Sequence, residues 1–373
     1  MKKILHILVL SQISGSQRIS LDILRNLPND EFEKHVLFGT EIKGDKRQEC
    51  QRLFEEAGVK VIYLNSLKRS IGLSDLSAAT AIYKLCRKER YDIVHTHSTK
   101  PGIIGRIAAT VAHVPIVIHT VHGLAFHDYI KFPKWQFYWL CEMFASCFCD
   151  HIVLVNQYYK KYFKWFKHKT CTIYNGVDFS QYHDIKYLTK QEGHEPTIKI
   201  LFVGRLDTQK DPLTLLKAAQ IVIRAIPSVQ FTIVGNGELY DTCKQFIHAN
   251  NMEEYINLAG WQNDVGPFYE KHDIFVLTSI YESFGLIFVE AGYHYLPIVT
   301  TNVEGIPEVV KNGKTGFLSN ARDYKKIADY IIQLAKDPQL RIKMGENAHV
   351  WVSEHFSIKQ MVDKYIDIYN CKK

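Results

Sequence analysis

The chain alternates short runs of branched apolar residues with longer stretches of helical periodicity. The first half contains KILHILVL, KHVLFG, VKVIYL, YDIVHTH, PIVIHTV, HIVLV and CTIYNG, and the second half contains IKILFVG, VQFTIVG, INLAG, DIFVLTS and LPIVTTN. Such alternation predicts parallel strands joined by crossover helices. Each half is therefore expected to form a doubly wound, Rossmann-like α/β sheet, in which ligands bind beyond the carboxyl ends of the strands.

The pattern lapses over residues 184–197, where the polar stretch DIKYLTKQEGHEPT contains glycine and proline and predicts a linker. A chain of 373 residues also suits two domains better than one core. We therefore expect an N-terminal domain over 1–185 and a C-terminal domain over 195–355. The last stretch, 356–373, is helical with no strand after it, and it is expected to pack back across the junction.

Composition narrows the class of protein. Eight cysteines lack the spacing of a disulfide framework and no signal peptide is recognisable, so we expect the reducing cytosol. No apolar run approaches the roughly 18 to 20 residues that cross a bilayer. The formal net charge of +7 fits an anionic ligand or an anionic surface. Nucleic acid is not expected as a partner, because no recognition motif for it is present.

Polar clusters follow directly after the predicted strands. In ILFVGRLDTQKDP the strand ends at Gly204, Arg205 follows, and Lys210 precedes an Asp-Pro that predicts a helix start. Two cations beside a helix N-terminus favour an anion site, although both side chains would also suit a solvated surface. Gly235 and Gly237, after the next strand, permit close backbone approach to a ligand, but a tight turn would explain them equally well.

The segment DIFVLTSIYESFGLIFVEAG repeats this arrangement as strand, loop and helix. Its loop carries Glu282, and the helix that follows carries Glu290 among apolar residues. Carboxylates accept hydrogen bonds from hydroxyls, so a ribose or a sugar is a suitable partner. The competing interpretation is an ordinary loop acid and a helix residue that reaches solvent.

Together these motifs resemble those of the retaining glycosyltransferases of family 4, which have the two-lobed GT-B fold and use nucleotide-sugar donors. The resemblance covers nearly the whole chain. It rests on VGRLDTQKDP, the two glutamates around SFG, NGVD, LAGWQNDV, EGIPEVV with NGKTGFL, GSQR, VHTHSTKPGIIGRIAA and HTVHG. The first half is similar to enzymes that build capsule or other surface polysaccharides on a polyprenyl-diphosphate carrier.

The resemblance implies a donor-binding C-terminal domain and an acceptor-binding N-terminal domain. Arg205 and Lys210 would neutralise the donor diphosphate, and Glu290 would hold the ribose. Glu282 and His122 would contact the donor sugar. Further donor contacts are implied for Gly15, Gly204, Gly235, Gly237, Trp261, Phe284, Gly285 and Leu286. Acceptor-side positions are Ser14, Ser16, His97 and Lys100.

One departure from the family pattern lies in the loop after the first strand. The family commonly has two glycines there, whereas this chain has Ser14 followed by Gly15. The serine would narrow the space near the acceptor or contribute a hydroxyl.

A metal is not expected. His95 and His97 alternate on a strand and would point the same way, as two zinc ligands do, but no cysteine or carboxylate completes a set at ligand spacing. No Asp-x-Asp is present to hold a metal on a diphosphate. We therefore expect no cofactor beyond the nucleotide-sugar co-substrate.

The resemblance implies that the anomeric configuration is retained by same-face attack, with the departing phosphate oxygen taking the acceptor proton, so no catalytic base is assigned. A UDP-hexose or UDP-N-acetylhexosamine and a lipid-linked glycan acceptor are expected. A sugar-nucleotide epimerase of the same fold and a non-catalytic lobe of a membrane complex are the alternatives. A nicotinamide dehydrogenase is disfavoured, because no G-x-G-x-x-G follows the first strand.

Residues 158–169, YYKKYFKWFKHK, would as an α-helix place six aromatics on one arc and four lysines on the other. Residues 129–140, YIKFPKWQFYWL, add a second aromatic and basic stretch. Basic amphipathic helices lie on membranes, which favours peripheral association with the anionic inner face of the plasma membrane. The alternative is an aromatic face packed on the sheet beneath solvated lysines.

Overall fold

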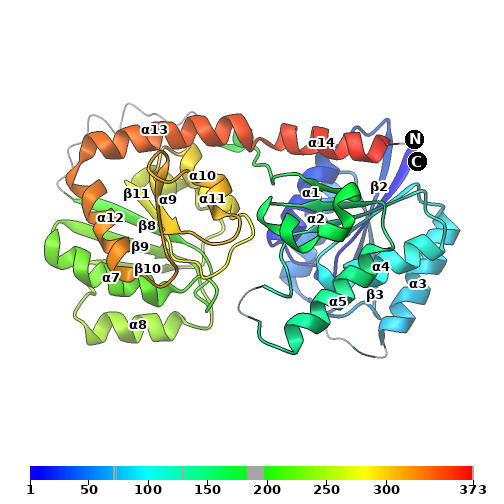
Figure 1. Ribbon diagram of the computed structural model, residues 1–373, viewed down its shortest axis with the longest axis horizontal. Helices are drawn as coiled ribbons and strands as arrows, with labels where there is room; N and C mark the ends of the chain where they lie inside the picture. The colour runs from blue at the N-terminus through cyan, green and yellow to red at the C-terminus, as the bar shows by residue number, and fades with distance from the viewer. Residues whose placement is uncertain (70–71, 73, 128–129, 183–196, 372–373) are drawn as a thin grey trace. The chain divides into compact units, whose positions relative to one another are not determined.

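A computed structural model describes residues 1–69, 72, 74–127, 130–182 and 197–371. It divides into two compact units (Figure 1). The first comprises Met1–Gly176 and Ile358–Lys373, and the second comprises Val177–Ser357. The predicted linker at 184–197 lies, apart from its last residue, outside the described part of the chain.

The first unit is built on a seven-stranded, all-parallel sheet in the order β3-β2-β1-β4-β5-β6-β7. The seven apolar runs expected to be strands in the first half all form strands. These are β1 (Lys2–Ile7), β2 (Phe32–Gly39), β3 (Lys60–Leu64), β4 (Ile93–His97), β5 (Ile116–Val121), β6 (His151–Leu154) and β7 (Thr170–Thr172).

Helices of the first unit connect these strands. They are α1 (Gly15–Asn26), α2 (Asp45–Glu56), α3 (Ser74–Glu89), α4 (Thr99–Val111) and α5 (Lys134–Ser146), with the short 3₁₀ helices η1 (Tyr158–Tyr162) and η2 (Lys164–Lys169). The aliphatic side chains of β1, β4 and β5 are almost fully buried, as expected for parallel strands covered on both faces.

The C-terminal helix α14 (Ile358–Asn370) belongs to the first unit, where it lies beside α1 (Figure 1). Its apolar stripe includes Tyr365 and Tyr369, which are completely buried against the sheet. The Lys2 ammonium donates to the carbonyl oxygen of Tyr369 at 2.9 Å and joins the end of α14 to β1. The C-terminal segment expected to be helical therefore is a helix, and it packs on the sheet of the first unit.

The second unit has a six-stranded parallel sheet in the order β10-β9-β8-β11-β12-β13. Its strands are β8 (Ile198–Val203), β9 (Val229–Val234), β10 (Ile256–Gly260), β11 (Ile274–Leu277), β12 (Ile298–Thr301) and β13 (Gly316–Ser319). The first five were expected, and β13 was not. Its described helices are η3 (Phe179–Gln181), α7 (Pro212–Ala225), α8 (Tyr240–Ala249), α9 (Gly266–Lys271), α10 (Leu286–Tyr293), α11 (Ile306–Val309), α12 (Tyr324–Lys336) and α13 (Pro338–His355).

The first of the two segments that make up the first unit ends at Gly176, whereas the N-terminal domain was expected to reach residue 185. The amide of Val177 donates to the carbonyl oxygen of Phe356 at 2.9 Å. The Phe179 ring stacks on Tyr293 with centroids 4.2 Å apart. Because these contacts hold the start of the 177–182 segment on α10 and the end of α13, the segment belongs to the second unit.

Each sheet reverses its strand order once, at β1/β4 in the first unit and at β8/β11 in the second. The two loops that leave such a pair diverge to opposite faces, so ligands of doubly wound proteins bind at this point beyond the carboxyl ends of the strands. The clusters described next lie at these two positions.

Candidate functional site

The loops after β8 and β11 bring together the predicted cation and carboxylate of the second unit. The ammonium of Lys210 forms an ion pair with the Glu282 carboxylate, and the two side chains are only 12% and 10% exposed. Thr278, just after β11, donates to the carbonyl oxygens of Lys210 and Asp211. These contacts hold the loop before α7 against the end of β11, so the lysine and the glutamate are positioned as a unit.

Arg205 follows β8 at the same edge, and its side chain is 61% exposed. The guanidinium donates to the Asp207 carboxylate and to the Gln209 side chain, each at 2.9 Å. Gln209 in turn donates to the carbonyl oxygen of Tyr281 at 3.1 Å. Arg205 thus presents an accessible guanidinium from a loop that is bonded to the loop carrying Glu282.

Glu290 lies one turn into α10 and accepts a hydrogen bond from the Tyr269 hydroxyl at 3.0 Å. Tyr269 is completely buried, and burial together with the Glu290 carboxylate raises its pKa well above 10. The phenol is therefore a permanent donor that fixes one carboxylate oxygen of Glu290. Glu290 therefore has a side-chain partner within the second unit.

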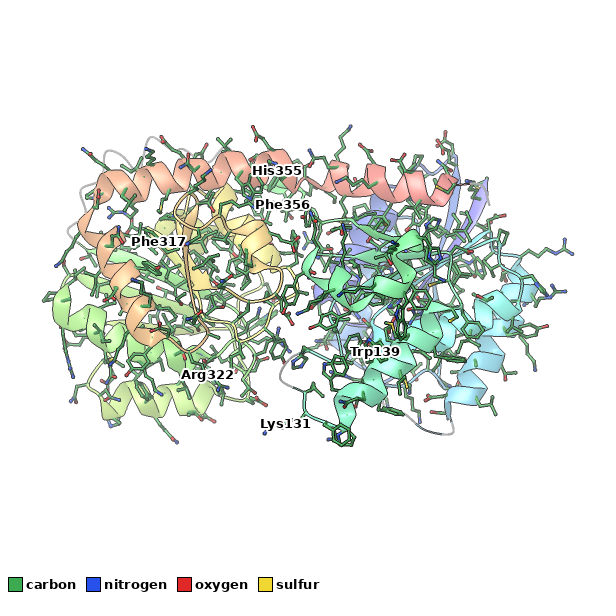
Figure 2. All side chains as sticks on the ribbon, in the orientation of Figure 1. Lys131, Trp139, Phe317, Arg322, His355 and Phe356 are labelled. Carbon is green, nitrogen blue, oxygen red and sulfur yellow. The ribbon has the colours of Figure 1, made fainter. Side chains whose placement is uncertain are left out.

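The loop between Glu282 and α10 has a backbone that only glycine accommodates. Gly285 has φ +78°, and a Cβ there would lie 2.6 Å from the Phe288 ring. Phe284 is buried and packs against Phe356, which is labelled at the end of α13 in Figure 2, with centroids 5.4 Å apart. Leu286 begins α10. The first amides of a helix have no partner within it, so α10 begins with donors at this edge.

Gly235 has a structural reason to be glycine that the sequence did not reveal. A Cβ at this position would lie 1.9 Å from the Gly204 carbonyl oxygen, and its φ is +140°. A Cβ at Gly237 would lie 2.3 Å from the Leu206 carbonyl oxygen. These glycines let the loops after β8 and β9 pack together, so their presence does not itself indicate a ligand. Trp261, after β10, is 68% exposed, and its indole donates to Asn263.

In the first unit, His122 follows β5 and is partly exposed. Its Nε2 lies 2.9 Å from Nδ1 of His97, and the two rings are stacked. Burial lowers the pKa of His122 to about 4, so the ring is neutral at physiological pH. A neutral imidazole offers one donor and one acceptor to a ligand or to its neighbours.

His97 itself is completely buried. It was expected on the acceptor side, and the structure places its ring within hydrogen-bond distance of His122, so the acceptor-side assignment stays a prediction. His95 and His97 do point to the same face, with ring centroids 4.1 Å apart.

The ligand atoms of His6, His95 and His97 lie within 4.8 Å of one another, which is the arrangement of a three-histidine metal site. His6 was not considered as a ligand, because it comes from a different strand, β1. However, every ring nitrogen of these three histidines already lies within 3.2 Å of a side-chain partner. Metal binding would have to break these hydrogen bonds, so the expectation of no metal stays a prediction.

The remaining acceptor-side residues surround the starts of α1 and α4. Ser14 and Gly15 are exposed, and the hydroxyls of Ser14 and Ser16 both donate to the Gln17 side-chain oxygen. Ser14 therefore uses its hydroxyl to hold the start of α1. The Lys100 ammonium pairs with Asp75 at 2.6 Å.

The aromatic and basic stretches of the first unit are not one amphipathic α-helix. Residues 158–169 form the two 3₁₀ helices η1 and η2 with a break at Phe163. The prediction of an α-helix with aromatic residues on one arc and lysines on the other is therefore wrong. Tyr159 and Phe163 are core residues, whereas Trp165 is 71% exposed and packs on Trp139 with centroids 5.3 Å apart. Lys131 and Trp139 mark this region in Figure 2.

The residues just before α5, α5 itself and η2 nevertheless carry exposed apolar side chains, which we call the aromatic face: Phe132, Phe137, Leu140, Phe144 and Trp165. Exposed lysines accompany it: Lys131, Lys134, Lys160, Lys161, Lys164 and Lys167. Over residues 131–169 the only acids are Glu142, which is buried, and Asp150. Among the described residues, no helix is both long and apolar enough to span a membrane.

Comparisons with known proteins agree with this arrangement. Residues 13–181 match the family described as Glycosyltransferase Family 4, and residues 184–351 match Glycosyl transferases group 1. The chain is 34% identical over 382 residues to an Escherichia coli protein named UDP-Gal:alpha-D-GlcNAc-diphosphoundecaprenol alpha-1,3-galactosyltransferase, covering 98% of this chain and 96% of that protein. It is 26% identical to the Staphylococcus aureus capsular polysaccharide biosynthesis glycosyltransferase CapM, covering 99% and 97%.

Solved structures share the fold at lower sequence identity. Anabaena Alr3699/HepE in complex with UDP and glucose has a TM-score of 0.80 and 21% identity, with 98% of this chain and 99% of that chain covered. The Thermosynechococcus elongatus sucrose-phosphate synthase has a TM-score of 0.82 and 18% identity, with 99% and 98% covered. At these identities the likeness shows the architecture of two parallel-sheet units.

Proposed function

Since this chain belongs to glycosyltransferase family 4 and has its GT-B fold, we propose that it transfers a hexose or N-acetylhexosamine from a UDP-sugar to a polyprenyl-diphosphate-linked glycan. The observation that carries the proposal is the cluster at the β8/β11 edge, where Arg205, Lys210 and Glu282 are held together. The name of the 34% identical relative supports the donor and the lipid carrier. The product would enter surface polysaccharide assembly.

The chemistry follows from the charges that develop as the bond to the leaving group breaks. Negative charge builds on the diphosphate, and positive charge builds on the sugar ring. Arg205 and Lys210 would stabilise the diphosphate, and preorganised charges of this kind often supply the largest part of a rate enhancement. Two cations can hold a diphosphate without a metal, so we propose that transfer is metal-independent.

Retention of the anomeric configuration is part of the proposal. The acceptor hydroxyl attacks from the face that the diphosphate leaves, and a departing phosphate oxygen takes its proton. No side chain is assigned as a base. Glu290, fixed by Tyr269, would bind the ribose hydroxyls, and Glu282 with His122 would orient the sugar.

The test is transfer of labelled sugar to a synthetic polyprenyl-diphosphate-linked GlcNAc acceptor by the purified chain, with and without EDTA. We expect a labelled lipid product whose anomeric configuration matches the donor, and the same rate with chelator. Epimerised free nucleotide sugar would instead indicate an epimerase. Failure to consume any UDP-, GDP- or dTDP-sugar would support a non-catalytic lobe.

A lipid-linked acceptor also requires access to a membrane surface, and we propose that the aromatic face provides it on the cytoplasmic side. Phe137, Leu140 and Phe144 occupy positions i, i+3 and i+7 of α5, so they form one exposed stripe. Exposed large apolar side chains together with exposed lysines of the same sequence stretches have the chemistry of an interfacial segment on anionic lipid. Each lysine near such a surface contributes about 1 kcal/mol of binding.

Vesicle flotation tests this surface. Replacing Lys160, Lys161, Lys164 and Lys167 by glutamine should weaken binding to vesicles with anionic lipid by as much as roughly a thousandfold, at about 1 kcal/mol each. The matched control replaces four exposed lysines of the second unit, Lys244, Lys271, Lys325 and Lys336, and changes the net charge equally. Equal losses in both variants, or binding without anionic lipid, would remove the aromatic face from the proposal.

A further inference from the structure

A continuous chain of hydrogen-bonded side chains crosses one face of the first unit's sheet and ends at His122. From its buried end the members are Tyr365, Thr120, His95, Tyr369, His6, His97 and His122. The six successive donor–acceptor distances are 3.1, 2.7, 2.7, 3.2, 3.0 and 2.9 Å. We call it the imidazole chain. Two members come from α14, four from strands, and His122 from the loop after β5.

The number of protons in the imidazole chain restricts the direction in which its hydrogen bonds can point. Burial lowers the pKa of His6, His95 and His97 well below 6.5, so each ring is neutral, with one donor nitrogen and one acceptor nitrogen. Each hydroxyl also donates once. Seven members therefore supply seven protons to six links. A neutral imidazole inside the chain must accept at one nitrogen and donate at the other, so the direction can reverse only at a hydroxyl that accepts from both neighbours, and the proton of that buried hydroxyl would then lack a partner within the chain. Otherwise a complete chain points in a single direction, and one proton remains at the end toward which it points.

The two ends differ in how they accommodate that proton. If the imidazole chain pointed toward Tyr365, the hydroxyl proton of a completely buried tyrosine would remain, and Thr120 is the only partner of that hydroxyl among the described residues. Leaving such a buried donor unsatisfied is unfavourable, because the hydroxyl loses its bond to water without gaining another partner. If it points toward His122, the remaining proton is on Nδ1 of a partly exposed ring, whose Nε2 accepts from His97. The second direction is favoured.

Among the described residues, Ser20 forms the one side branch, with its hydroxyl 2.8 Å from Nδ1 of His6. In the favoured direction this nitrogen carries a proton, which the serine can accept, while the serine's own proton can turn to a carbonyl of the preceding turn of α1, as helical serines do. If the imidazole chain pointed toward Tyr365, Nδ1 of His6 would carry no proton, and Ser20 and His97 would both donate to its single lone pair. The branch therefore does not reverse the preference.

We propose that the imidazole chain holds His122 as the Nδ1–H tautomer, so that this histidine donates a hydrogen bond to an oxygen of the sugar diphosphate and cannot act as a base. Tyr369 is then a positioning residue, because its hydroxyl joins His95 to His6 and maintains the direction of the links that follow. This inference rests on the proposed function in one respect, which is the identity of the oxygen atom that accepts the hydrogen bond from His122.

The tautomer is measured by NMR of the full chain labelled with ¹⁵N-histidine, without donor, and the His122 signals are assigned with His122→Gln. We expect a pyrrole-type Nδ1 and a pyridine-type Nε2. Tyr369→Phe removes one hydroxyl and should populate the other tautomer. It should also lower kcat by about tenfold, the equivalent of 1.4 kcal/mol, while the affinity for free UDP is unchanged. Thr120→Val breaks the chain elsewhere and should act in the same direction.

Tyr91→Phe is the matched control, since the Tyr91 hydroxyl bonds to the buried His35 at 2.7 Å in the same unit, outside the imidazole chain. It should cost similar stability and leave the His122 tautomer unchanged. A pyridine-type Nδ1 in the wild-type protein, or an unchanged tautomer in both Tyr369→Phe and Thr120→Val, would overturn the proposal. Stoichiometric metal bound to His6, His95 and His97 would also overturn it. A wild-type protein without transfer activity that keeps the expected tautomer would contradict the proposed function alone.

Discussion

Breaking the ion pair between Lys210 and Glu282 should separate the binding of the nucleotide from the orientation of the sugar. Glu282→Ala leaves the Lys210 ammonium largely buried without its partner, because the two side chains are 12% and 10% exposed. Removing one member of a buried pair costs about 3–5 kcal/mol, and we expect about 3 because both groups keep some contact with solvent. For a unit of this size that corresponds to a fall in Tm of roughly 6–12 °C.

The effects on UDP binding and on turnover should differ between Lys210→Ala and Glu282→Ala. Lys210→Ala removes a charged partner of the diphosphate and should weaken binding of free UDP by roughly ten- to a hundredfold, or about 1.5–3 kcal/mol. Glu282→Ala should leave UDP binding intact and lower turnover of the intact donor, since its proposed ligand is the sugar. Titration calorimetry with UDP and steady-state rates with UDP-sugar separate these outcomes.

A double-mutant cycle measures the pair itself. If the contact is energetically real, Lys210→Ala with Glu282→Ala should be less destabilised than the sum of the single variants by about 1–3 kcal/mol. The exposed i,i+4 pair Lys359–Asp363, with side chains 85% and 57% exposed, is the control and should show about 0.5 kcal/mol or less. Additive losses at Lys210 and Glu282, together with equal losses of UDP affinity, would refute the reasoning.

Three other expectations follow from the same structure. Arg205→Ala should lower kcat by roughly 10² to 10³ with Tm unchanged, because the guanidinium is exposed, and near-normal turnover would remove it from the diphosphate site. Glu290→Ala should weaken free UDP and UDP-sugar together by about tenfold or more, and Tyr269→Phe should do so to a smaller extent; normal UDP titrations of both variants would contradict the ribose assignment. Folded His122 has a pKa of about 4 against 6.5 when unfolded, and the pKa values of His6, His95 and His97 are lowered in the same direction, so the unfolded state binds more protons below pH 6.5 and Tm should fall as the pH drops from about 6.5 toward 4; a constant Tm from pH 7 to 5 would contradict these lowered pKa values.

Much of the fold was predictable because periodicity is a local property. Most of the apolar runs that became β1 to β12 are rich in branched or aromatic residues. Strand β13 (Gly316–Ser319) was missed, because GFLS is short and starts with glycine. That glycine is required by packing, since a Cβ would lie 2.0 Å from the Ile298 carbonyl oxygen, and such a contact is invisible in a linear pattern.

For residues 158–169, by contrast, the sequence pattern predicted an α-helix that the structure does not contain. A repeat of 100° per residue assumes an α-helix, but residues 158–169 form two 3₁₀ turns, so the rotation per residue is different and Trp165 lies among the lysines. Composition alone would have identified the basic character of the segment. Its exposed surface depends on α5, which is adjacent only in the folded unit, where Trp139 packs on Trp165.

The sequence by itself determined that Arg205, Lys210 and Glu282 lie in loops after strands and that Glu290 lies in the helix that follows such a loop, because side chains that follow a parallel strand lie at the carboxyl edge of its sheet. Only the tertiary structure decided which of them are partners. The pairing of Lys210 with Glu282 joins residues 72 positions apart, and the bond from His95 to Tyr369 joins residues 274 positions apart. The order of the strands in each sheet and the packing of α14 on the first unit create these contacts. Neither can be predicted from a local sequence pattern.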